Sequence, residues 1–497
     1  MALNWLNQEI GTTDQEQSAQ TTFGIESFRP GQSELITAAM AGKNVLGIMP
    51  TGSGKSLVFQ LPRLLGPKGR TTLVVSPLLA LMRNQVKNLQ DLGISAAAYN
   101  SSLDDDKRAE VLSQTRDGAL AFLFTSAEQL GKTDFIDGTR GAPFDSTAVD
   151  EAHCISQWGH DFRPSYLEID TFNRRRNIGQ TLAFTATAST MVQDDIRKNL
   201  NLKDAATYES DPHRPNLNYQ VLKTPTPADK KAKLLELLKA NPDGSRIIYC
   251  SSRIEAFALQ KSLQQSGIQA GLYHGKMETA EREQTEQDFL SDKTQTLIAT
   301  NAFGMGIDKP NIRLIVHYNV PGNVEAYMQE TGRAGRDGEK ANCALLYRPE
   351  DLVIQNRFLQ AKTPDLGFVL MIYKALKRQL EHDRQTKIPG HFTLNRVALY
   401  IATQRKDEKG KITKRDTEVN AAIDILKNIG ALKDFQNICS FNPAVDEGSL
   451  EELLGQISTV RSDIAKATLG QMVKYAEHPN PSQEVLVELM RQDLRVK

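Results

Sequence analysis

The sequence predicts an α/β protein with two successive parallel-sheet domains and a mainly helical C-terminal region. From about residue 45 to 200, short apolar runs alternate with segments of helical period, which is the rhythm of a parallel sheet with flanking helices. The rhythm breaks at the Pro-rich segment 211–215 and then resumes. After about residue 351 the strand-like runs stop. We therefore expect α/β domains over residues 1–210 and 211–350.

The expected strands are the apolar runs themselves. In the first domain they cover 45–49, 72–76, 120–124, 146–150 and 181–185. In the second domain they cover 246–250, 296–300, 313–319 and 343–348. The two sets predict two parallel sheets joined by the Pro-rich segment.

The C-terminal region contains helix-like segments and few strand-like runs. Three such segments lie near 367–381, 392–404 and 416–429, before a short apolar stretch. Three helices closed by a small hairpin would form a winged-helix-like domain over 351–445, although any small helical domain would give a similar pattern. Residues 446–497 are expected to form a helical tail, split at the Pro-containing segment 478–481.

The composition is that of a folded protein. Hydrophobic residues make up 40% and charged residues 24% of the 497 positions, so disorder is not expected. The 60 basic side chains are balanced by 60 acidic ones, so the chain lacks the global basic field of simple nucleic-acid coating proteins. Any contact with nucleic acid must therefore be local.

Cysteine usage and the N-terminus indicate a cytoplasmic protein with no membrane partner. The four cysteines, Cys154, Cys250, Cys343 and Cys439, are about 90 or more residues apart, which fits neither a disulfide scaffold nor a metal cluster. The N-terminus lacks a basic segment followed by a long apolar run, and no stretch approaches roughly 18 consecutive apolar residues.

A phosphate-binding loop is expected directly after the apolar run 45–49. Its glycines let backbone N–H groups close around phosphate oxygens, and the following helix adds its positive N-terminal end. Lys55 would reach the β- and γ-phosphates, and the Ser56 hydroxyl would hold Mg²⁺. Met49 replaces the first glycine of the strict pattern, so a plain Gly/Ser turn is the alternative. The candidate nucleotide-binding residues are Thr51, Gly52, Ser53, Gly54, Lys55 and Ser56.

An acidic pair, Asp150-Glu151, ends a later apolar run and precedes Ala152-His153. One carboxylate can hold Mg²⁺ and the other can polarise an attacking water. Alone, an acidic pair at a strand end is commonplace. Following a phosphate loop in one α/β domain, it predicts an ATPase with Asp150 as the metal ligand and Glu151 as the base.

Further motifs follow in a fixed order between about residues 20 and 350. They are FRPGQ (28–32), SPLLAL (76–81), HCISQWGHDFRP (153–164), TAT (185–187), YCSSR (249–253), YHG (273–275), TNAFGMGIDKP (300–310) and QETGRAGR (329–336). The set resembles the motifs of superfamily-two helicases and, in detail, those of the RecQ family. The resemblance implies two RecA-like domains with ATP and Mg²⁺ at their interface.

The resemblance assigns several residues to the nucleotide. Gln32 would hydrogen-bond the adenine edge with support from Arg29, and Ile25 stands where many relatives carry an aromatic residue that stacks on the base. From the second domain, Gly306 and Asp308 would lie beside the nucleotide. Gln329, Arg333 and Arg336 would complete the catalytic set, with Arg336 as the finger on the γ-phosphate and Arg333 as its partner. If this segment is helical, the two arginines share one face.

The resemblance also assigns a strand-binding surface. Trp158 and Phe162 would stack on unpaired bases, and Arg163 would pair with a phosphate or base. The alternative is that both aromatic residues are buried in the core. The TAT motif would link hydrolysis to movement of the lobes. The remaining candidate strand contacts are Ser76, Pro77, Arg253, His274, Thr300 and Asn301.

The C-terminal part departs from the family pattern. Full-length RecQ proteins carry a zinc module of four clustered cysteines after the second lobe, whereas only Cys343 and Cys439 follow Arg336 here. Residues 461–477 resemble the helix that precedes those cysteines, so we expect a short RecQ-like subtype without zinc. Basic residues predominate between 405 and 415, in a segment that would either grip a duplex backbone or form a solvated loop.

By this resemblance we expect an ATP-dependent DNA helicase of 3′-to-5′ direction that acts on single-stranded and forked DNA in repair or recombination. The rival hypothesis is an ATP-switched binding or remodelling component of a larger assembly without processive unwinding. An RNA helicase is a weaker third reading.

Overall fold

The computed structural model describes residues 12–50, 52–156, 161–304, 309–362, 364–383, 391–403, 405–406, 412–413, 416–435, 438–443, 445, 447–492 and 494. The chain forms two compact units. Unit 1 comprises Met1–Pro349 with Gln471–Asp493, and unit 2 comprises Glu350–Gly470 with Leu494–Lys497. The tail expected over 446–497 is thus divided between the two units, because one long helix crosses position 470.

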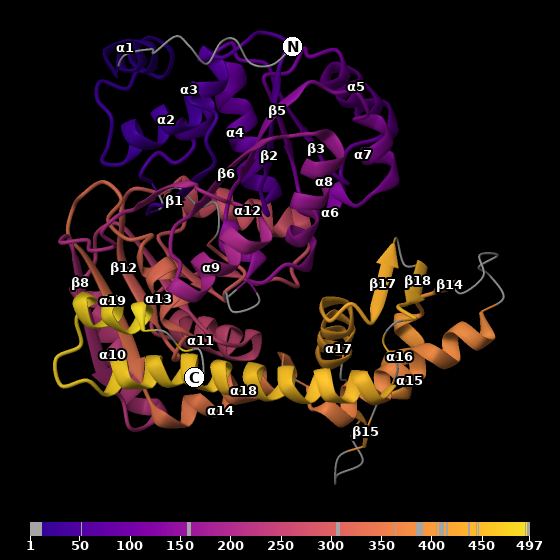
Figure 1. Cartoon of the computed structure of the whole chain (residues 1–497). Helices are drawn as coiled ribbons and strands as arrows, with labels where there is room; N and C mark the ends of the chain where they lie inside the picture. The colour runs from indigo at the N-terminus through magenta and orange to yellow at the C-terminus, as the bar shows by residue number, and fades with distance from the viewer. Residues whose placement is uncertain are drawn as a thin grey trace. The chain divides into compact units, whose positions relative to one another are not determined.

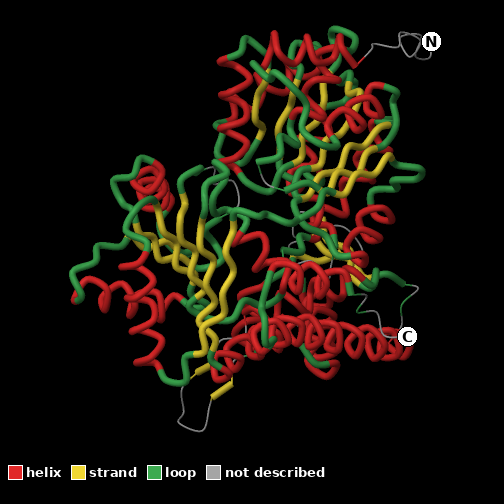
Figure 2. Tube along the Cα trace, turned by 90° about the vertical axis from the view of Figure 1, so that its left-hand side faces the viewer, coloured by secondary structure: helices red, strands yellow, loops and turns green. Residues whose placement is uncertain are grey.

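The first lobe of unit 1 is a seven-stranded sheet of order β3-β4-β2-β5-β6-β1-β7, and every pair in it is parallel (Figures 1 and 2). The strands are β1 Val45–Ile48, β2 Thr71–Val75, β3 Ala96–Tyr99, β4 Phe122–Thr125, β5 Phe144–Val149, β6 Gln180–Thr185 and β7 Ala206–Glu209. All five expected runs are strands. The two that the sequence pattern missed, β3 and β7, are the edges of the sheet, where less apolar sequences suffice.

Helices cover both faces of this sheet and bury their apolar sides against it. One core layer takes residues from α1 to α4, and the other takes residues from α5, α7, α8 and α9. The helices are α1 Thr12–Phe23, α2 Gln32–Met40, α3 Leu57–Leu65, α4 Leu79–Asp91, α5 Asp105–Arg116, α6 Ala127–Leu130, α7 Thr133–Gly138, α8 Glu168–Arg176 and α9 Thr190–Asn199. Two 3₁₀ turns, η2 Ala152–Ile155 and η3 Pro164–Leu167, flank the segment after the acidic pair.

The second lobe of unit 1 repeats this plan with a six-stranded parallel sheet of order β10-β11-β9-β12-β13-β8. Its strands are β8 Leu217–Lys223, β9 Ser245–Tyr249, β10 Gly271–Tyr273, β11 Thr296–Ala299, β12 Ile312–His317 and β13 Ala341–Tyr347. Its helices are α10 Pro227–Ala240, α11 Arg253–Gln265, α12 Thr279–Leu290 and α13 Val324–Thr331. As in the first lobe, the strands that were not expected, β8 and β10, are the sheet edges. Two tandem RecA-like domains are thereby confirmed.

Side-chain caps begin three helices of the second lobe. Ser252 accepts a hydrogen bond from Glu255 N at the start of α11, and Asn323 accepts one from Ala326 N at the start of α13. Thr226 and Asp229 form a capping box at α10. Such caps satisfy backbone N–H groups that have no partner inside the helix.

Unit 2 has a helical core closed by a small antiparallel sheet of order β14-β18-β17. Its elements are η4 Pro349–Asp351, α14 Leu352–Lys362, α15 Leu366–His382, β14 His391–Thr393, α16 Arg396–Ala402, α17 Asp416–Asn428, β17 Leu432–Phe435 and β18 Ile438–Phe441. The three expected helices correspond to α15, α16 and α17, so the mainly helical character of this region agrees with the expectation, and a winged-helix-like domain stays a prediction. In the basic segment, Arg405–Lys406 (β15) pairs antiparallel with Ile412–Thr413 (β16).

Helix α18, Glu447–Glu477, begins in unit 2 and ends in unit 1. With α19, Gln483–Arg491, its last part forms an antiparallel pair that we call the C-terminal hairpin, residues 471–491. Leu486, Leu489 and Met490 of α19 are buried. No helix among the described residues combines the length and apolarity needed to cross a bilayer.

Candidate nucleotide site and strand surface

The phosphate-binding loop joins the end of β1 to the start of α3, as expected. Gly52 and Gly54 have φ of 84° and 78°, a left-handed conformation that other residues adopt only with strain. A Cβ atom at Gly54 would lie 2.5 Å from the Gln32 amide nitrogen, so only glycine fits there. The Ser53 hydroxyl is buried and has no hydrogen-bond partner among the residues that the structure describes. Thr51 lies outside the described residues.

Gln32 and Arg29 hold this loop from the side. The Gln32 side chain donates from Nε2 to the carbonyl oxygens of Ser53 and Gly54, both at 3.0 Å, and accepts from Arg29 N at 2.8 Å. The Arg29 guanidinium donates to the carbonyl of Gly52. The expected adenine-reading segment is therefore joined directly to the phosphate loop, which sequence motifs alone did not indicate.

The acidic pair stands at the carboxyl end of β5. Asp150 accepts a hydrogen bond from the Ser76 hydroxyl at 3.2 Å and from Glu151 N at 3.0 Å. Burial, and then the neighbouring charge of Glu151, raise the pKa of Asp150 to about 6, while Lys55 acts to lower it. A cation bound beside Asp150 would favour its charged form and lower this raised pKa. The oxygen donors at the site therefore fit a metal ion.

Glu151 adopts a strained backbone. Its φ of 49° and ψ of 49° are left-handed, which for a residue other than glycine costs on the order of 1–3 kcal/mol. The Oε2 atom is buried and lies 3.3 Å from His153 Nδ1, and within the described part of the chain it has no hydrogen-bond partner. A strained residue with an unused acceptor oxygen is suited to receive a proton from a water.

His153 connects the acidic pair to the end of β6. Its Nδ1 lies 2.9 Å from the Thr185 hydroxyl, which in turn donates to the Thr187 carbonyl at 3.0 Å. Burial lowers the pKa of His153 to about 4, so the ring is neutral near pH 7. Because Thr185 spends its only hydrogen on Thr187, His153 is the donor from Nδ1. The TAT motif is thus hydrogen-bonded to the acidic motif.

The two arginines of the second lobe lie in a turn and not on a helix. Helix α13 ends at Thr331, and Gly335, with φ of 53°, belongs to the turn that follows. The condition under which Arg333 and Arg336 would share a helix face is therefore not met. Arg333 is 5% exposed and donates to the Gly304 carbonyl. Arg336 is half-buried in the turn.

A small cavity joins the lobes near this turn. Its volume is about 40 Å³, and Gln329 of α13 lines it together with Pro50 of the phosphate loop, Thr187 and Arg214. Gln329 therefore faces the first lobe, as a residue of a shared site must. Arg214 was not expected at the site. Its only sequence signal is its place in the Pro-rich segment between the domains.

On the first lobe, hydrogen bonds connect the described residues of the strand surface to the acidic pair. Phe162 and Arg163 are half-buried, and Arg163 donates from Nη1 to the Pro77 carbonyl at 3.0 Å and pairs with Asp161 at 3.2 Å. Pro77 and Ser76 are buried, and the Ser76 hydroxyl is engaged with Asp150. In this structure Ser76 and Pro77 therefore join the loop to the acidic pair. Trp158 lies outside the described residues.

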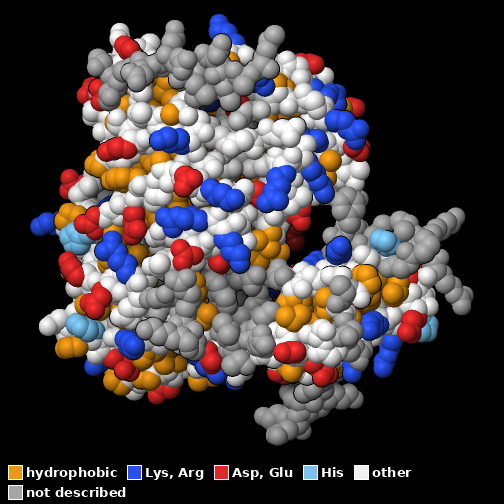
Figure 3. Space-filling model, viewed as in Figure 1, with side chains coloured by type: hydrophobic (Ala, Val, Ile, Leu, Met, Phe, Trp, Pro, Cys, Tyr) orange, Lys and Arg blue, Asp and Glu red, His pale blue; other side chains and the backbone are white. Residues whose placement is uncertain are grey.

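On the second lobe, the expected strand contacts differ in exposure. Arg253 and Asn301 are exposed, whereas Thr300 and His274 are each 7% exposed. Phe257, which the motifs did not single out, is exposed on α11 with its ring 5.3 Å from that of His274. Gly306 and Asp308 lie outside the described residues. Basic and acidic side chains alternate over the visible face, in keeping with the balanced composition (Figure 3).

Comparisons with known proteins agree with this arrangement. Residues 29–196 match the family model for DEAD/DEAH box helicases, and residues 229–338 match the model for the helicase conserved C-terminal domain. The two matched segments coincide with the two lobes. Fold and site together define a protein of the DEAD/DEAH box helicase class.

Curated relatives narrow the class. The chain is 41% identical over 408 residues to ATP-dependent DNA helicase RecQ of Bacillus subtilis, covering 82% of this chain and 67% of the relative. It is 35% identical over 375 residues to the probable ATP-dependent DNA helicase RecS of the same organism, covering 75% of each. The chain belongs to the RecQ family of superfamily-two helicases. It spans 55% of the length of the Haemophilus influenzae RecQ helicase, to which it is 41% identical over 343 residues, 69% of this chain.

Solved structures of lower identity support the fold. Saccharomyces cerevisiae Dbp5 bound to RNA and ADP BeF₃ matches with a TM-score of 0.56 at 20% identity, covering 72% of this chain and 92% of that one. Mycobacterium smegmatis helicase Lhr bound to single-stranded DNA and AMP-PNP matches with a TM-score of 0.56 at 19% identity, covering 91% and 62%.

Proposed function

We propose that this protein is an ATP-dependent DNA helicase that moves 3′ to 5′ along single-stranded DNA and unwinds tailed or forked duplexes in repair or recombination. The observation that carries the proposal is the presence in one compact unit of a phosphate loop, an acidic pair and an arginine turn, contributed by two lobes. Family membership supports the choice of DNA.

The family implies ATP and Mg²⁺, and the side chains of the site fit them. Lys55 and the loop N–H groups would bind the phosphates, while Ser56 and Asp150 would hold the cation. Bound ATP·Mg²⁺ would supply the phosphoryl group to be transferred and neutralise its charge. Ser53, whose hydroxyl lacks a partner, offers a further donor.

In the proposed mechanism the chain's own groups act in a fixed order. Glu151 accepts the proton of the attacking water at Oε2, the atom for which no described residue is a hydrogen-bond partner. Arg336, with Arg333 beside it, stabilises charge from the second lobe. His153 then passes any shift of Glu151 to Thr185 and Thr187, because these groups are already hydrogen-bonded.

We propose that a bound DNA strand also acts on the acidic pair, through Phe162 and Arg163. Arg163 is bonded to the Pro77 carbonyl, and the neighbouring Ser76 is bonded to Asp150. A strand that moves Phe162 or Arg163 would therefore disturb the acidic pair through two hydrogen bonds. Through this path a bound strand would stimulate hydrolysis.

The test is strand displacement on a forked DNA duplex labelled on one arm. We expect unwinding with ATP and none with a non-hydrolysable analogue. A duplex with a single 3′ tail should be unwound, and one with a single 5′ tail should not. Hydrolysis stimulated by DNA without displacement would support the ATP-switched component instead, and displacement of an RNA fork at equal rate would contradict the preference for DNA.

A further inference from the structure

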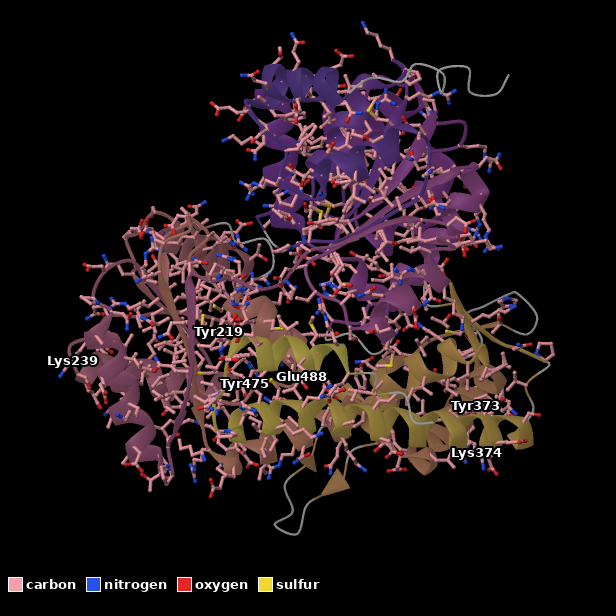
Figure 4. The ribbon with its side chains drawn as sticks, turned by 60° about the vertical axis from the view of Figure 1, so that its left-hand side comes forward. Tyr219, Lys239, Tyr373, Lys374, Tyr475 and Glu488 are labelled. Atoms are coloured by element: carbon pink, nitrogen blue, oxygen red, sulfur yellow. The ribbon has the colours of Figure 1, made fainter. Side chains whose placement is uncertain are left out.

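The C-terminal hairpin belongs to the same compact unit as the two lobes and packs on α13, the helix that leads into the arginine turn. Tyr475 of the hairpin is buried, with its ring 5.6 Å from that of Tyr327 on α13. Tyr219 of β8 (Figure 4) also contacts α13, with its ring 6.1 Å from that of Tyr327. Helix α13 is therefore held by aromatic contacts from both the hairpin and the sheet.

Gln483, the first residue of α19, binds the joint between the lobes. Its Oε1 accepts from Arg214 N at 2.9 Å, and its Nε2 donates to the Pro212 carbonyl at 2.8 Å. The side chain is 6% exposed, so both bonds are made largely out of water. Such bonds are costly to leave unmade.

Arg214 extends this contact to the arginine turn. Its Nη2 donates to the Gly335 carbonyl at 2.7 Å and to the Ala334 carbonyl at 3.3 Å. Asn216 adds a bond to Gly335 O at 2.8 Å. The carbonyls between Arg333 and Arg336 are thus fixed by the joint, and the joint is fixed by Gln483.

The hairpin also reaches the first lobe. Arg491, at the end of α19, lies 3.6 Å from Glu209, at the end of β7. This pair is partly exposed and contributes little energy by itself. The cavity of about 40 Å³ near the turn is lined by Arg214, Gln329, Gln483 and Thr187. The buried Thr187 hydroxyl has no hydrogen-bond partner among the residues described. The cavity is large enough to hold water beside the turn.

We propose that Gln483 and Arg214 are positioning residues for hydrolysis, which hold the arginine turn through the joint between the lobes. The inference rests on the proposed function. The C-terminal hairpin then contributes to ATP hydrolysis, because it positions the arginine turn. Since small misplacements of a charged catalytic group can cost up to about 100-fold in rate, loss of these bonds acts on turnover.

The test compares steady-state ATP hydrolysis, with saturating single-stranded DNA, in the full chain and in variants. Gln483→Met keeps the size of the side chain and removes both hydrogen bonds. Gln483→Glu keeps the acceptor for Arg214 N and loses the donor to Pro212. Arg214→Lys keeps the charge and loses the planar fork that reaches two carbonyls. The matched control is Glu488→Gln, an exposed site on the same helix (Figure 4).

We expect kcat to fall roughly 10- to 100-fold in Gln483→Met and Arg214→Lys, with a smaller loss in Gln483→Glu. The Kd for a non-hydrolysable ATP analogue should stay close to that of Glu488→Gln, and the Tm should fall only by the few degrees that loss of these hydrogen bonds costs. The double variant should lose little more than either single variant, because both act through one chain of bonds.

Two results would overturn the inference in an active protein. One is turnover of Gln483→Met equal to that of the control. The other is a joint fall of Tm, analogue affinity and kcat in all three variants, which would indicate a purely structural role. Failure of the unsubstituted protein to hydrolyse ATP would instead reject the proposed function, so the two failures are distinguishable.

Discussion

His153 donates a hydrogen bond from Nδ1 to the hydroxyl of Thr185 over 2.9 Å. The bond joins the acidic motif to the motif at the end of the neighbouring strand β6, 32 residues along the chain. A neutral ring is required, since burial opposes a charged imidazole. The pH dependence of stability follows from this environment.

Burial lowers the pKa of His153 to about 4 from an ordinary 6.5. Between these values the unfolded chain binds a proton that the folded chain does not. The free energy of unfolding is therefore unaffected by this group above pH 6.5 and is lowered by about 3 kcal/mol as the pH falls to 4. Replacing the ring with His153→Gln removes this term, so the variant should become more stable relative to the original protein as the pH falls.

Asp150 changes the free energy of unfolding in the opposite direction from His153. Its pKa is raised to about 6 from 3.8, so the folded chain binds a proton that the unfolded chain does not between these values. Protonation of Asp150 therefore raises the free energy of unfolding as the pH falls from 6. Asp150→Asn lacks this gain, so the variant should become less stable relative to the original protein over the same range. Thermal melting without nucleotide or Mg²⁺ from pH 4 to 6.5 measures both variants. Parallel curves for all three proteins would contradict the two environments.

The nucleotide site predicts a separation of binding from chemistry. Lys55→Ala should abolish ATP turnover by removing phosphate charge, whereas Glu151→Gln should bind nucleotide and fail to hydrolyse it, because the water loses its base. Turnover and equilibrium binding of a fluorescent ATP analogue are measured together. The control is the exposed Lys68→Ala. Turnover of more than a few per cent in either variant would remove the assignment.

The strand surface predicts loss of coupling. Phe162→Ala or Trp158→Ala should weaken single-stranded DNA binding by about 1–3 kcal/mol and reduce DNA-stimulated hydrolysis, with nucleotide affinity unchanged. Fluorescence anisotropy of a labelled oligonucleotide measures the first effect. If Tm and nucleotide affinity both fall sharply in these variants, the two aromatic residues are part of the hydrophobic core and not of a strand-binding surface.

The C-terminal region predicts that no structural zinc is bound. Cys343 lies in β13, where burial raises the pKa of its thiol to about 12 and disfavours the thiolate that binds metal. At the turn of the hairpin, His478 Nδ1 lies 2.8 Å from the carbonyl of Asn480. Metal analysis after purification without a metal resin should give far less than one zinc per chain, and a strong chelator should leave Tm unchanged. Stoichiometric zinc would reject this reading.

The sequence by itself determined the α/β class, the order of the two lobes and the contiguous motifs. Each of these depends on local pattern, because a buried parallel strand needs an apolar run and a phosphate loop needs its own glycines. Central strands such as β1 and β5 were predicted for this reason. The edge strands β3, β7, β8 and β10 were not, since an edge is defined by its neighbours and not by its own sequence.

Only the tertiary structure decided which distant side chains meet. Gln32 was expected only at the adenine edge, and Gln483 was not singled out in the sequence. In the structure Gln32 binds the phosphate loop, and Gln483 binds Arg214, 269 residues away, in the joint between the lobes. The arginine turn likewise depends on Gly335, whose left-handed backbone is fixed by Arg214 and Asn216. These hydrogen bonds form because folding brings a donor and an acceptor together from distant parts of the chain. The local sequence around either residue does not indicate which distant residue it will contact.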